Sequence, residues 1–380
     1  MQPVVEYSGD CLLISTLDGS CLTYNTAGKA SATPTIIKSQ PVAGKAVDDV
    51  AKGIVLCAKF SNSGKLLAIC NDYKQILLYE LNTGCPSDYT LISSRSTAKK
   101  AVKLEFLQDD SEVLMADKFG DVTSFSVLKP EKEGDVILGH LSMLLDCILI
   151  HDGKYLVSAD RDEKIRVTHY PNTYNIQAFC LGHTSYVTSL AAAEEWLVSA
   201  SADSSVKLWN PVTGTMLSEV TCSSDSKVVQ QVVYVPTHKC VVCLIAGSTK
   251  LVIITIEFDK DVPKFSKVLE ERELSAPALS MSMYKDNILA LLNCENAPLQ
   301  LINIDKEGKE VEMSVAGDLE NICKDLTSRW SAFADAYNIQ SNFFRNLTKM
   351  NMDNVEEELA RKGKRLCTSE ESAGKLPKIN

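Results

Sequence analysis

Short runs of alternating hydrophobic and polar residues, separated by turn residues, follow one another along most of the chain. Two long stretches repeat the same order of runs: LGHLSMLLDCILIHDGKYLVSADRDEKIRVTHY at 138–170 and LGHTSYVTSLAAAEEWLVSASADSSVKLWN at 181–210. Each reads Gly-His, an apolar alternation, a turn, Leu-Val-Ser, a tight turn with Asp and a last alternating run. Since alternation with a period of two predicts β-strands, each copy predicts a unit of antiparallel strands joined by turns.

The spacing of the two copies identifies the kind of repeat. Their Gly-His pairs lie 43 residues apart. Units that begin with Gly-His and repeat about every 40 to 45 residues are typical of WD40 proteins, in which each propeller blade has four strands. Weaker copies flank the two strong ones at residues 11–25, 53–81, 101–128, 228–258 and 279–305. Seven blades close a ring and remove long unpaired sheet edges. We therefore predict an all-β fold, a seven-bladed WD40 β-propeller over residues 1–314, whose N-terminal segment completes the last blade.

The period changes after residue 315, where apolar residues recur at helical spacing. They are Leu319, Ile322, Leu326, Trp330 and Phe333. This spacing predicts a helical C-terminal extension over 315–362 that packs outside the ring. The remaining residues, 363–380, are basic and polar and are predicted to be disordered.

Polar residues at fixed places in the second strong copy predict a buried hydrogen-bonded set. In a WD40 blade a His before the first strand can bond a Ser and a turn Asp, and the Ser meets a Trp indole. His183, Ser199, Asp203 and Trp209 fill these places. A Ser/His/Asp set also suggests a hydrolase, but no G-x-S-x-G elbow accompanies it, so a structural role is favoured.

The other strong copy keeps only part of this set. His140, Ser158 and Asp162 take the corresponding places, whereas Thr168 stands where Trp209 would be. We therefore predict that this blade lacks the indole anchor.

The charge and composition of the chain exclude some classes of function. The chain of 380 residues is 45% hydrophobic and carries 39 basic and 49 acidic residues, a net charge of −10. An acidic total disfavours a surface that tracks nucleic acid broadly, so any such contact should be local or shared with a partner. The N-terminus lacks the pattern of a secretion signal and no apolar run is long enough to span a membrane, so we expect a soluble intracellular protein.

Thirteen cysteines could suggest disulfides or metal, but most lie in apolar strand-like runs. We read them as reduced core residues. Cys240 and Cys243 form a C-x-x-C, yet in a strand they face opposite sides and no second Cys/His pair has zinc-site spacing. No metal site is predicted.

The stretch SADRDEKIRV at 158–167 holds six charged residues, whereas its counterpart SADSSVKLWN holds two. A solvated turn could carry these charges. Mixed charges of fixed geometry also suit a docking surface, where they set register and discriminate among partners. Arg166 is the best single candidate because its planar fork can clamp a carboxylate. Lys118, in the corresponding turn of the preceding blade, is expected to be its neighbour on the ring's face.

Four strings exceed generic WD40 similarity: LGHLSMLLD (138–146), ADRDEKIRV (159–167), FCLGHT (179–184) and ADKFGDVTSFSVL (116–128). They resemble the WD-repeat non-catalytic subunit of the tRNA (guanine-N7-)-methyltransferase. The resemblance is most convincing from about 55 to 210 and weak in the tail. It implies a heterodimer in which a separate subunit binds S-adenosylmethionine and forms 7-methylguanosine at position 46, in the variable loop of tRNA.

In that family the WD-repeat subunit does no chemistry and has no cofactor of its own. It holds the catalytic subunit in active form and helps to seat the tRNA. The resemblance carries the contact with the catalytic subunit onto Lys118, Asp162, Glu163, Lys164 and Arg166. It also implies a nuclear location, with the cytoplasm as a further possibility.

The basic end of the predicted helical extension is a separate candidate site. Lys349, Arg361, Lys362, Lys364 and Arg365 could reach tRNA phosphates once the chain is docked beside a basic partner. A solvated helix end and a nuclear-import signal explain the same cluster equally well.

Two other functions are open to a propeller that carries no enzyme motif. A ubiquitin-ligase substrate receptor usually has W-D-x-R at the end of a blade, but here Trp209 is followed by Asn210, Pro211 and Val212. A chromatin or histone-binding propeller would bind basic peptides on its acidic surface. The sequence does not reveal which tRNAs are used or whether other complexes compete for the same face.

Overall fold

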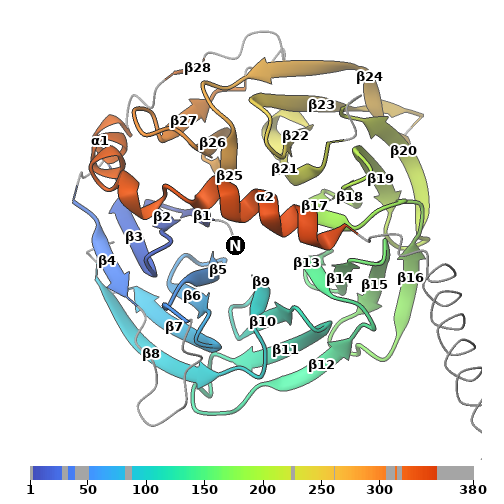
Figure 1. Ribbon diagram of the computed structural model, residues 1–380. Helices are drawn as coiled ribbons and strands as arrows, with labels where there is room; N and C mark the ends of the chain where they lie inside the picture. Colours follow the sequence, from blue (N-terminus) through green and yellow to red (C-terminus); the bar gives the residue numbers. More distant parts are fainter. Residues whose placement is uncertain are drawn as a thin grey trace, which may run out of the picture.

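The computed structural model describes residues 3–27, 33–38, 51–81, 88–223, 227–260, 262–304, 313–314 and 319–348. Within these ranges the strands form seven four-stranded antiparallel sheets arranged as a closed ring (Figure 1). Each sheet is a blade of four consecutive strands, and the first strand of each blade lies nearest the centre. The prediction of a seven-bladed propeller is confirmed.

The bounds of the strands follow the predicted repeats, and we number the blades along the chain. The first three blades are β1 (Val5–Ser8), β2 (Cys11–Ser15), β3 (Ser20–Asn25) and β4 (Thr35–Lys38); β5 (Val55–Phe60), β6 (Leu66–Asn71), β7 (Gln75–Leu81) and β8 (Tyr89–Ser96); and β9 (Ala101–Phe106), β10 (Glu112–Asp117), β11 (Asp121–Ser126) and β12 (Asp135–Gly139). The fourth and fifth are β13 (Leu144–Ile150), β14 (Tyr155–Asp160), β15 (Ile165–His169) and β16 (Ile176–Cys180); and β17 (Val187–Ala193), β18 (Trp196–Ser201), β19 (Ser205–Asn210) and β20 (Thr215–Thr221). The last two are β21 (Val229–Val235), β22 (Cys240–Ile245), β23 (Lys250–Asp259) and β24 (Val262–Glu273); and β25 (Ala278–Tyr284), β26 (Asn287–Leu292), β27 (Leu299–Ile302) and β28 (Met313–Ser314).

The hydrophobic core lies between neighbouring blades rather than inside any one of them. On β14, Leu156 packs toward the third blade while Val157 packs toward the fifth, because successive side chains of a strand face opposite sides. All six residues of β14 are buried. Middle strands therefore read as nearly continuous apolar runs, whereas outer strands such as β16 keep exposed residues.

The cysteines of the described residues form no disulfide. Cys240 packs in the core toward the seventh blade and Cys243 in the core toward the fifth, so the C-x-x-C pair points to two sides of one strand. Within the same ranges, no three His, Cys, Asp or Glu side chains are grouped so that they could hold a metal ion.

The ring closes differently from the prediction. β1 pairs with β2 in its own blade, and the last blade takes all four of its strands from residues 278–314, so no strand is exchanged. The seam is instead closed by side chains. Tyr7 of β1 and Tyr284 of β25 lie with ring centroids 4.5 Å apart, and Leu12 and Leu291 share one apolar cluster.

Helix α1 (Glu320–Ser328) covers this seam. Its buried residues Ile322 and Leu326 join the cluster shared by the first and last blades. The hydroxyl of Tyr24 donates a hydrogen bond to Asp325 Oδ2 at 2.8 Å, which ties the helix to β3.

Helix α2 (Ala336–Leu347) lies across the face of the ring, over its centre, rather than outside the ring as predicted (Figure 1). Its last turn carries Phe344 and Leu347, which pack with Leu145 and Tyr186 of the fourth and fifth blades. The apolar residues that the sequence places at helical spacing, from Leu319 to Phe333, belong to α1 and the segment that follows it. The apolar side of α2 is covered instead by the ends of the inner strands. No described helix has the length and apolar character needed to cross a membrane.

Candidate docking site on the fourth blade

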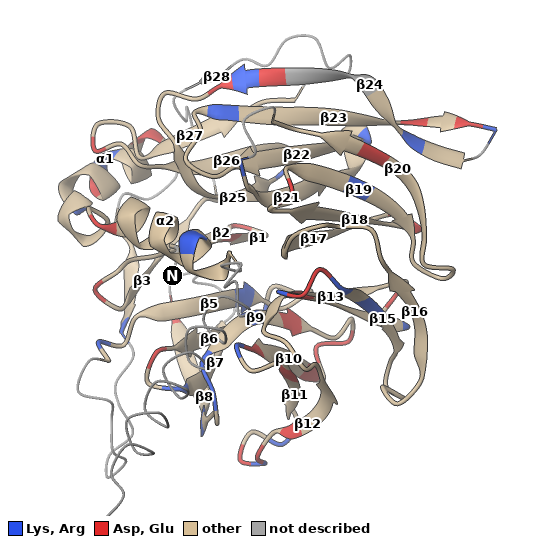
Figure 2. Cartoon of the chain, turned by 45° about the vertical axis from the view of Figure 1, so that its right-hand side comes forward, with Lys and Arg blue, Asp and Glu red and all other residues tan. Residues whose placement is uncertain are grey.

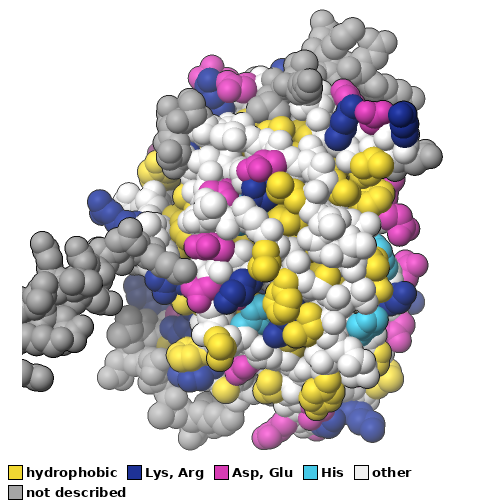
Figure 3. Space-filling view, turned by 90° about the vertical axis from the view of Figure 1, so that its right-hand side faces the viewer, with side chains coloured by type: hydrophobic (Ala, Val, Ile, Leu, Met, Phe, Trp, Pro, Cys, Tyr) yellow, Lys and Arg dark blue, Asp and Glu magenta, His cyan; other side chains and the backbone are white. Residues whose placement is uncertain are grey.

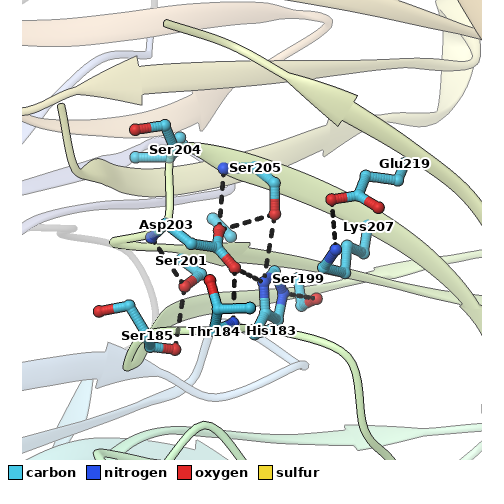
Figure 4. A network of polar contacts seen from close by, with 12 residues as sticks. His183, Thr184, Ser185, Ser199, Ser201, Asp203, Ser204, Ser205, Lys207 and Glu219 are labelled. Atoms are coloured by element: carbon cyan, nitrogen blue, oxygen red, sulfur yellow. Dashed lines mark hydrogen bonds and ion pairs between the residues drawn. The ribbon is translucent and has the colours of Figure 1, made fainter. Parts of the chain in front are cut away.

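The buried polar set of the fifth blade has the geometry expected from its sequence (Figure 4). His183 lies with Nδ1 2.9 Å from Asp203 Oδ2 and with Nε2 2.8 Å from Ser199 Oγ. The Trp209 indole N–H donates to the same Ser199 oxygen at 2.8 Å. The polar groups of this set satisfy one another's hydrogen bonds. Because His183 and Trp209 are buried, a substrate cannot reach them.

Asp203 is held as a carboxylate by this network. Burial alone would raise its pKa, but hydrogen bonds from His183, Ser205 and the backbone N–H of Thr184 lower the pKa well below the ordinary value. A carboxylate that accepts several hydrogen bonds is stabilised in its charged form. The set therefore anchors the blade.

The fourth blade uses a different aspartate from the predicted one. His140 Nδ1 lies 3.0 Å from Asp160 Oδ2 and Nε2 lies 2.7 Å from Ser158 Oγ, so Asp160 holds the position that the sequence alignment gives to Asp162. In the fourth blade the bonded aspartate, Asp160, follows the serine by two residues. In the fifth blade Asp203 follows Ser199 by four residues. Thr168, at the Trp position, is buried and its hydroxyl has no hydrogen-bond partner within the described chain.

Asp160 shapes the turn that carries the extra charges. Its Oδ1 accepts hydrogen bonds from the N–H groups of Asp162 at 2.9 Å and Lys164 at 3.1 Å, and its own N–H donates to the Lys164 carbonyl at 3.0 Å. Glu163 takes a left-handed conformation with φ 70° at the tip. The turn is therefore rigid, and Asp162, Glu163 and Lys164 are not needed for the buried set.

Arg166 follows this turn on β15. Its Nη2 donates to the carbonyl of Gly139 at 3.1 Å, and its Nε is buried without a hydrogen-bond partner among the described residues. Burial lowers the pKa of Arg166, and nearby Asp160 opposes this shift. The guanidinium is a partly desolvated cation at the surface of the ring.

Lys118 lies in the equivalent turn of the third blade, where Asp117 Oδ1 accepts the N–H groups of Phe119 and Gly120 at 2.7 and 3.1 Å. Its ammonium lies 5.6 Å from the centroid of the Phe343 ring on α2. Burial, and then the charge of Lys100, lower the pKa of Lys118. The structure thus places Lys118 against α2 at the ring centre, whereas Arg166 lies against the outer strand of the third blade.

Sequence reasoning passed over Arg161 as a functional residue. Its Nε donates to the carbonyl of Leu347 at 3.1 Å, and the Tyr186 hydroxyl donates to the carbonyl of Phe344 at 3.1 Å. Together these bonds fix the C-terminal end of α2 beside the charged turn. No local signal in the sequence indicates this contact, because the two segments lie far apart along the chain.

A second group of charges lines the ring centre beneath α2, around a cavity of about 220 Å³. Lys103 pairs with Asp146 at 3.1 Å, and Asp146 raises the pKa of Lys103 against the effect of burial. Asp146 also accepts the backbone N–H of Cys147 at 2.8 Å and of Leu190 at 2.7 Å. These partners give the group a structural role in joining the third, fourth and fifth blades.

The candidate tRNA-contacting residues lie outside the described residues. They are Lys349, Arg361, Lys362, Lys364 and Arg365. The last described residue before them is Thr348, which directly follows the carbonyl held by Arg161.

Comparisons with known proteins agree with this architecture. The family model described as the tRNA methyltransferase TRM82 WD40 domain matches residues 28–135 and 126–318. A zebrafish (Danio rerio) protein named tRNA (guanine-N(7)-)-methyltransferase non-catalytic subunit wdr4 is 34% identical over 337 residues, which cover 85% of this chain and 80% of the relative. The mouse (Mus musculus) protein of the same description is 30% identical over 330 residues, or 83% and 77% of the two chains.

Among solved structures, a chain of the mitotic checkpoint complex aligns with a TM-score of 0.62 at 14% identity, over 76% of this chain and 86% of that one. At this identity the likeness concerns the propeller fold alone. The sequence relatives are each named as non-catalytic subunits, which agrees with the expectation that this chain is not an enzyme. By the match to the family model and by relatives that align over more than three quarters of both chains, the chain belongs to the tRNA methyltransferase TRM82 WD40 domain family.

Proposed function

We propose that this chain is the non-catalytic scaffold subunit of a heterodimeric tRNA (guanine-N7)-methyltransferase. The catalytic subunit binds S-adenosylmethionine and methylates guanosine 46 in the variable loop, and this chain needs no cofactor. Its role is to stabilise the catalytic subunit in its active form and to help seat the tRNA. Family membership supports the complex, and the geometry of the fourth blade supports the place where it forms.

The observation that carries the proposal is the rigid charged turn of the fourth blade. Asp160 holds the backbone of Asp162 and Lys164 through its own carboxylate, so the backbone that carries the charged residues before β15 is fixed before any partner arrives (Figure 2). A preorganised surface loses little conformational entropy on binding. Opposite charges within one turn set the register of a partner and exclude partners with the wrong pattern. Asp162, Glu163, Lys164 and Arg166 therefore form the docking turn in this proposal.

Lys118 adds a contact from the third blade. Its ammonium is partly desolvated between Phe343 and Lys100, and no carboxylate pairs with it among the residues that the structure describes. A carboxylate of the catalytic subunit would relieve this desolvation. The contact thus extends from the docking turn toward the end of α2.

A contact with tRNA follows from the place where α2 ends. Arg161 holds the Leu347 carbonyl beside the docking turn, so the basic residues 349–365 follow from a point close to the bound catalytic subunit. We propose that Lys349, Arg361, Lys362, Lys364 and Arg365 neutralise tRNA phosphates there, since the acidic total of the chain restricts RNA contact to a local cluster. The same cluster would suit nuclear import, and we propose that the complex works in the nucleus.

The test is Arg166→Leu in the full chain, titrated by calorimetry with the purified catalytic subunit. The affinity should fall by about 1 to 3 kcal/mol, because a partner carboxylate is left buried without its cation. Methylation of guanosine 46 by the mixed subunits should fall at limiting concentrations and recover at high concentrations. The melting temperature of the isolated variant should stay close to that of the wild type.

A matched control is Arg272→Leu on β24. Its guanidinium also donates to a backbone carbonyl, that of Glu271 at 3.1 Å, but it lies on the sixth blade. This variant should bind and support methylation as the wild type does. Equal affinity of the wild type and Arg166→Leu would remove the docking turn from the proposal, and methylation by this chain alone would overturn the scaffold role.

A further inference from the structure

The fifth blade contains a cation at the same position as Arg166, and there the fold supplies its carboxylate. Lys207 lies opposite Ser199 on one side and opposite Glu219 of β20 on the other. Its side chain is 3% exposed and pairs with the Glu219 carboxylate (Figure 4). Side chains directly opposite across antiparallel strands lie on the same face of the sheet, so this pairing follows from the register. The buried ammonium is neutralised inside its own blade.

In the fourth blade the carboxylate is replaced by an aromatic ring. Arg166 lies opposite Ser158 of β14 and opposite Phe179 of β16, in the register that Lys207 has in the fifth blade. No carboxylate within the described chain forms an ion pair with Arg166, and the hydrogen bond to Gly139 leaves its buried Nε without an acceptor. Asp160 is near enough to oppose the effect of burial but forms no ion pair with Arg166, and a partly desolvated guanidinium without a paired carboxylate is costly to the isolated chain.

Apolar side chains surround this cation at the surface. Leu141 is fully exposed, and Phe179, Leu181 and Met216 are 43%, 62% and 47% exposed. Leu141 lies two residues from the carbonyl that Arg166 binds, and Leu181 directly follows β16. Figure 3 shows hydrophobic side chains gathered beside charged ones on this side of the ring, where β16 and β20 lie. A single exposed leucine is ordinary, but a group of them around a half-buried cation marks an interaction site.

We propose that Phe179 keeps Arg166 open for a carboxylate of the catalytic subunit, and that Leu141, Phe179 and Leu181 bind an apolar side chain next to that carboxylate. This inference rests on the proposed function and names the chemistry of the partner segment, an Asp or Glu beside an aliphatic or aromatic residue. The apolar rim excludes water from the ion pair, which strengthens it. A phosphate backbone would instead place hydrated oxygens against Leu141 and Leu181, so the site fits a protein segment.

The sharpest test is Phe179→Glu, which supplies the carboxylate inside the blade as Glu219 does for Lys207. The full-length variant should keep or raise the melting temperature and should bind the purified catalytic subunit at least tenfold more weakly. Phe258→Glu on β23 is the matched control, because Phe258 is 45% exposed and the change in net charge is the same. This control should bind as the wild type does.

Phe179→Gln separates the carboxylate from the loss of the ring. It removes the same aromatic contact but offers no negative charge, so its affinity should lie between those of the wild type and Phe179→Glu. Equal weakening by Gln and Glu would show that the ring acts by packing alone and would overturn the claim that Phe179 keeps Arg166 open.

The apolar rim is tested by Leu141→Ala, with Tyr174→Ala as control, because Tyr174 is 95% exposed at the opposite end of the fourth blade. Leu141→Ala should weaken binding at least threefold, and the loss should persist at high salt, which screens charge but not apolar contact. Tyr174→Ala should have no effect at either salt concentration.

The remaining outcomes separate this inference from the proposed function. If Phe179→Glu and Leu141→Ala bind as the wild type does while Arg166→Leu binds weakly, the inference fails and the docking turn stands. If the wild-type chain does not bind the catalytic subunit, both fail. If sedimentation shows that the chain self-associates and Leu141→Ala abolishes only that association, a second copy occupies the site and the inference is wrong.

Discussion

Single buried residues decide how each blade is anchored. The fourth and fifth blades build the same hydrogen-bonded pair of His and Asp from aspartates at different places in the repeat. In the fifth blade His183 bonds Asp203, whereas in the fourth blade His140 bonds Asp160. The consensus order of residues is enough to predict the first set. It is not enough for the second, because Asp160 and Asp162 both lie in the turn, and only the backbone register determines which of them bonds His140.

The Asp203 network makes stability depend on pH with a definite sign. The folded state lowers the pKa of Asp203 below its ordinary value of 3.8, so the unfolded chain binds a proton first as the pH falls. The stabilising contribution is therefore complete above that value and is lost as the pH drops through the lowered pKa. Asp203→Asn should be less stable at neutral pH and should lose less of its free energy of unfolding between about pH 4 and pH 2.

Urea unfolding of both proteins across this range provides the measurement. Asp286→Asn is a control, because Asp286 is exposed in the turn between β25 and β26 and its carboxylate takes part in no hydrogen bond or ion pair among the described residues. Parallel pH curves for the wild type and Asp203→Asn would contradict the assignment of this carboxylate to the stabilising network.

Among the elements, the turns and α2 show which structural features a sequence pattern can predict and which it cannot. The excess charge of the β14–β15 turn and the apolar spacing of the residues that α1 buries are both visible in the sequence. The path of α2 is not, since it depends on Arg161, Tyr186 and the inner-strand ends meeting residues far away along the chain. The exposed neighbours of Arg166 are likewise defined only by strand register.

Phe344→Ala tests whether α2 is an independently released element. Phe344 is buried against Leu145 and Tyr186, so its loss should cost about 3 to 5 kcal/mol at that contact. Hydrogen exchange of the α2 amides should become much faster, while exchange in β14 and β18 stays slow. Arg345→Ala, on the exposed side of the same helix, should leave α2 protection nearly unchanged. Uniform acceleration throughout the ring would show instead that α2 and the blades unfold as one unit.

At the level of the whole molecule, seven repeats predict a ring because blades need neighbours to bury both faces. The number of blades and most strand positions follow from the sequence alone. The seam does not, because a closed ring can be completed by an exchanged strand or by side-chain packing, and the repeat pattern is compatible with both. Here Tyr7, Tyr284 and the residues of α1 perform the closure.

Ile322→Ala should therefore destabilise the entire ring although it changes a helix outside the blades. Ile322 is fully buried in the cluster of the first and last blades, and the loss should be about 2 to 5 kcal/mol in one cooperative thermal transition. Lys324→Ala, on the exposed side of α1, should change stability by less than about 0.5 kcal/mol. A normal melting temperature for Ile322→Ala would show that α1 does not support the closure.

Closure without strand exchange has a mechanical consequence. Because no backbone hydrogen bonds of an exchanged strand cross the seam, a stretching force should part the first and last blades before it shears any sheet. The protein should then yield like a split ring, opening at one joint into an arc of intact blades, and α1 sets how much force that joint withstands.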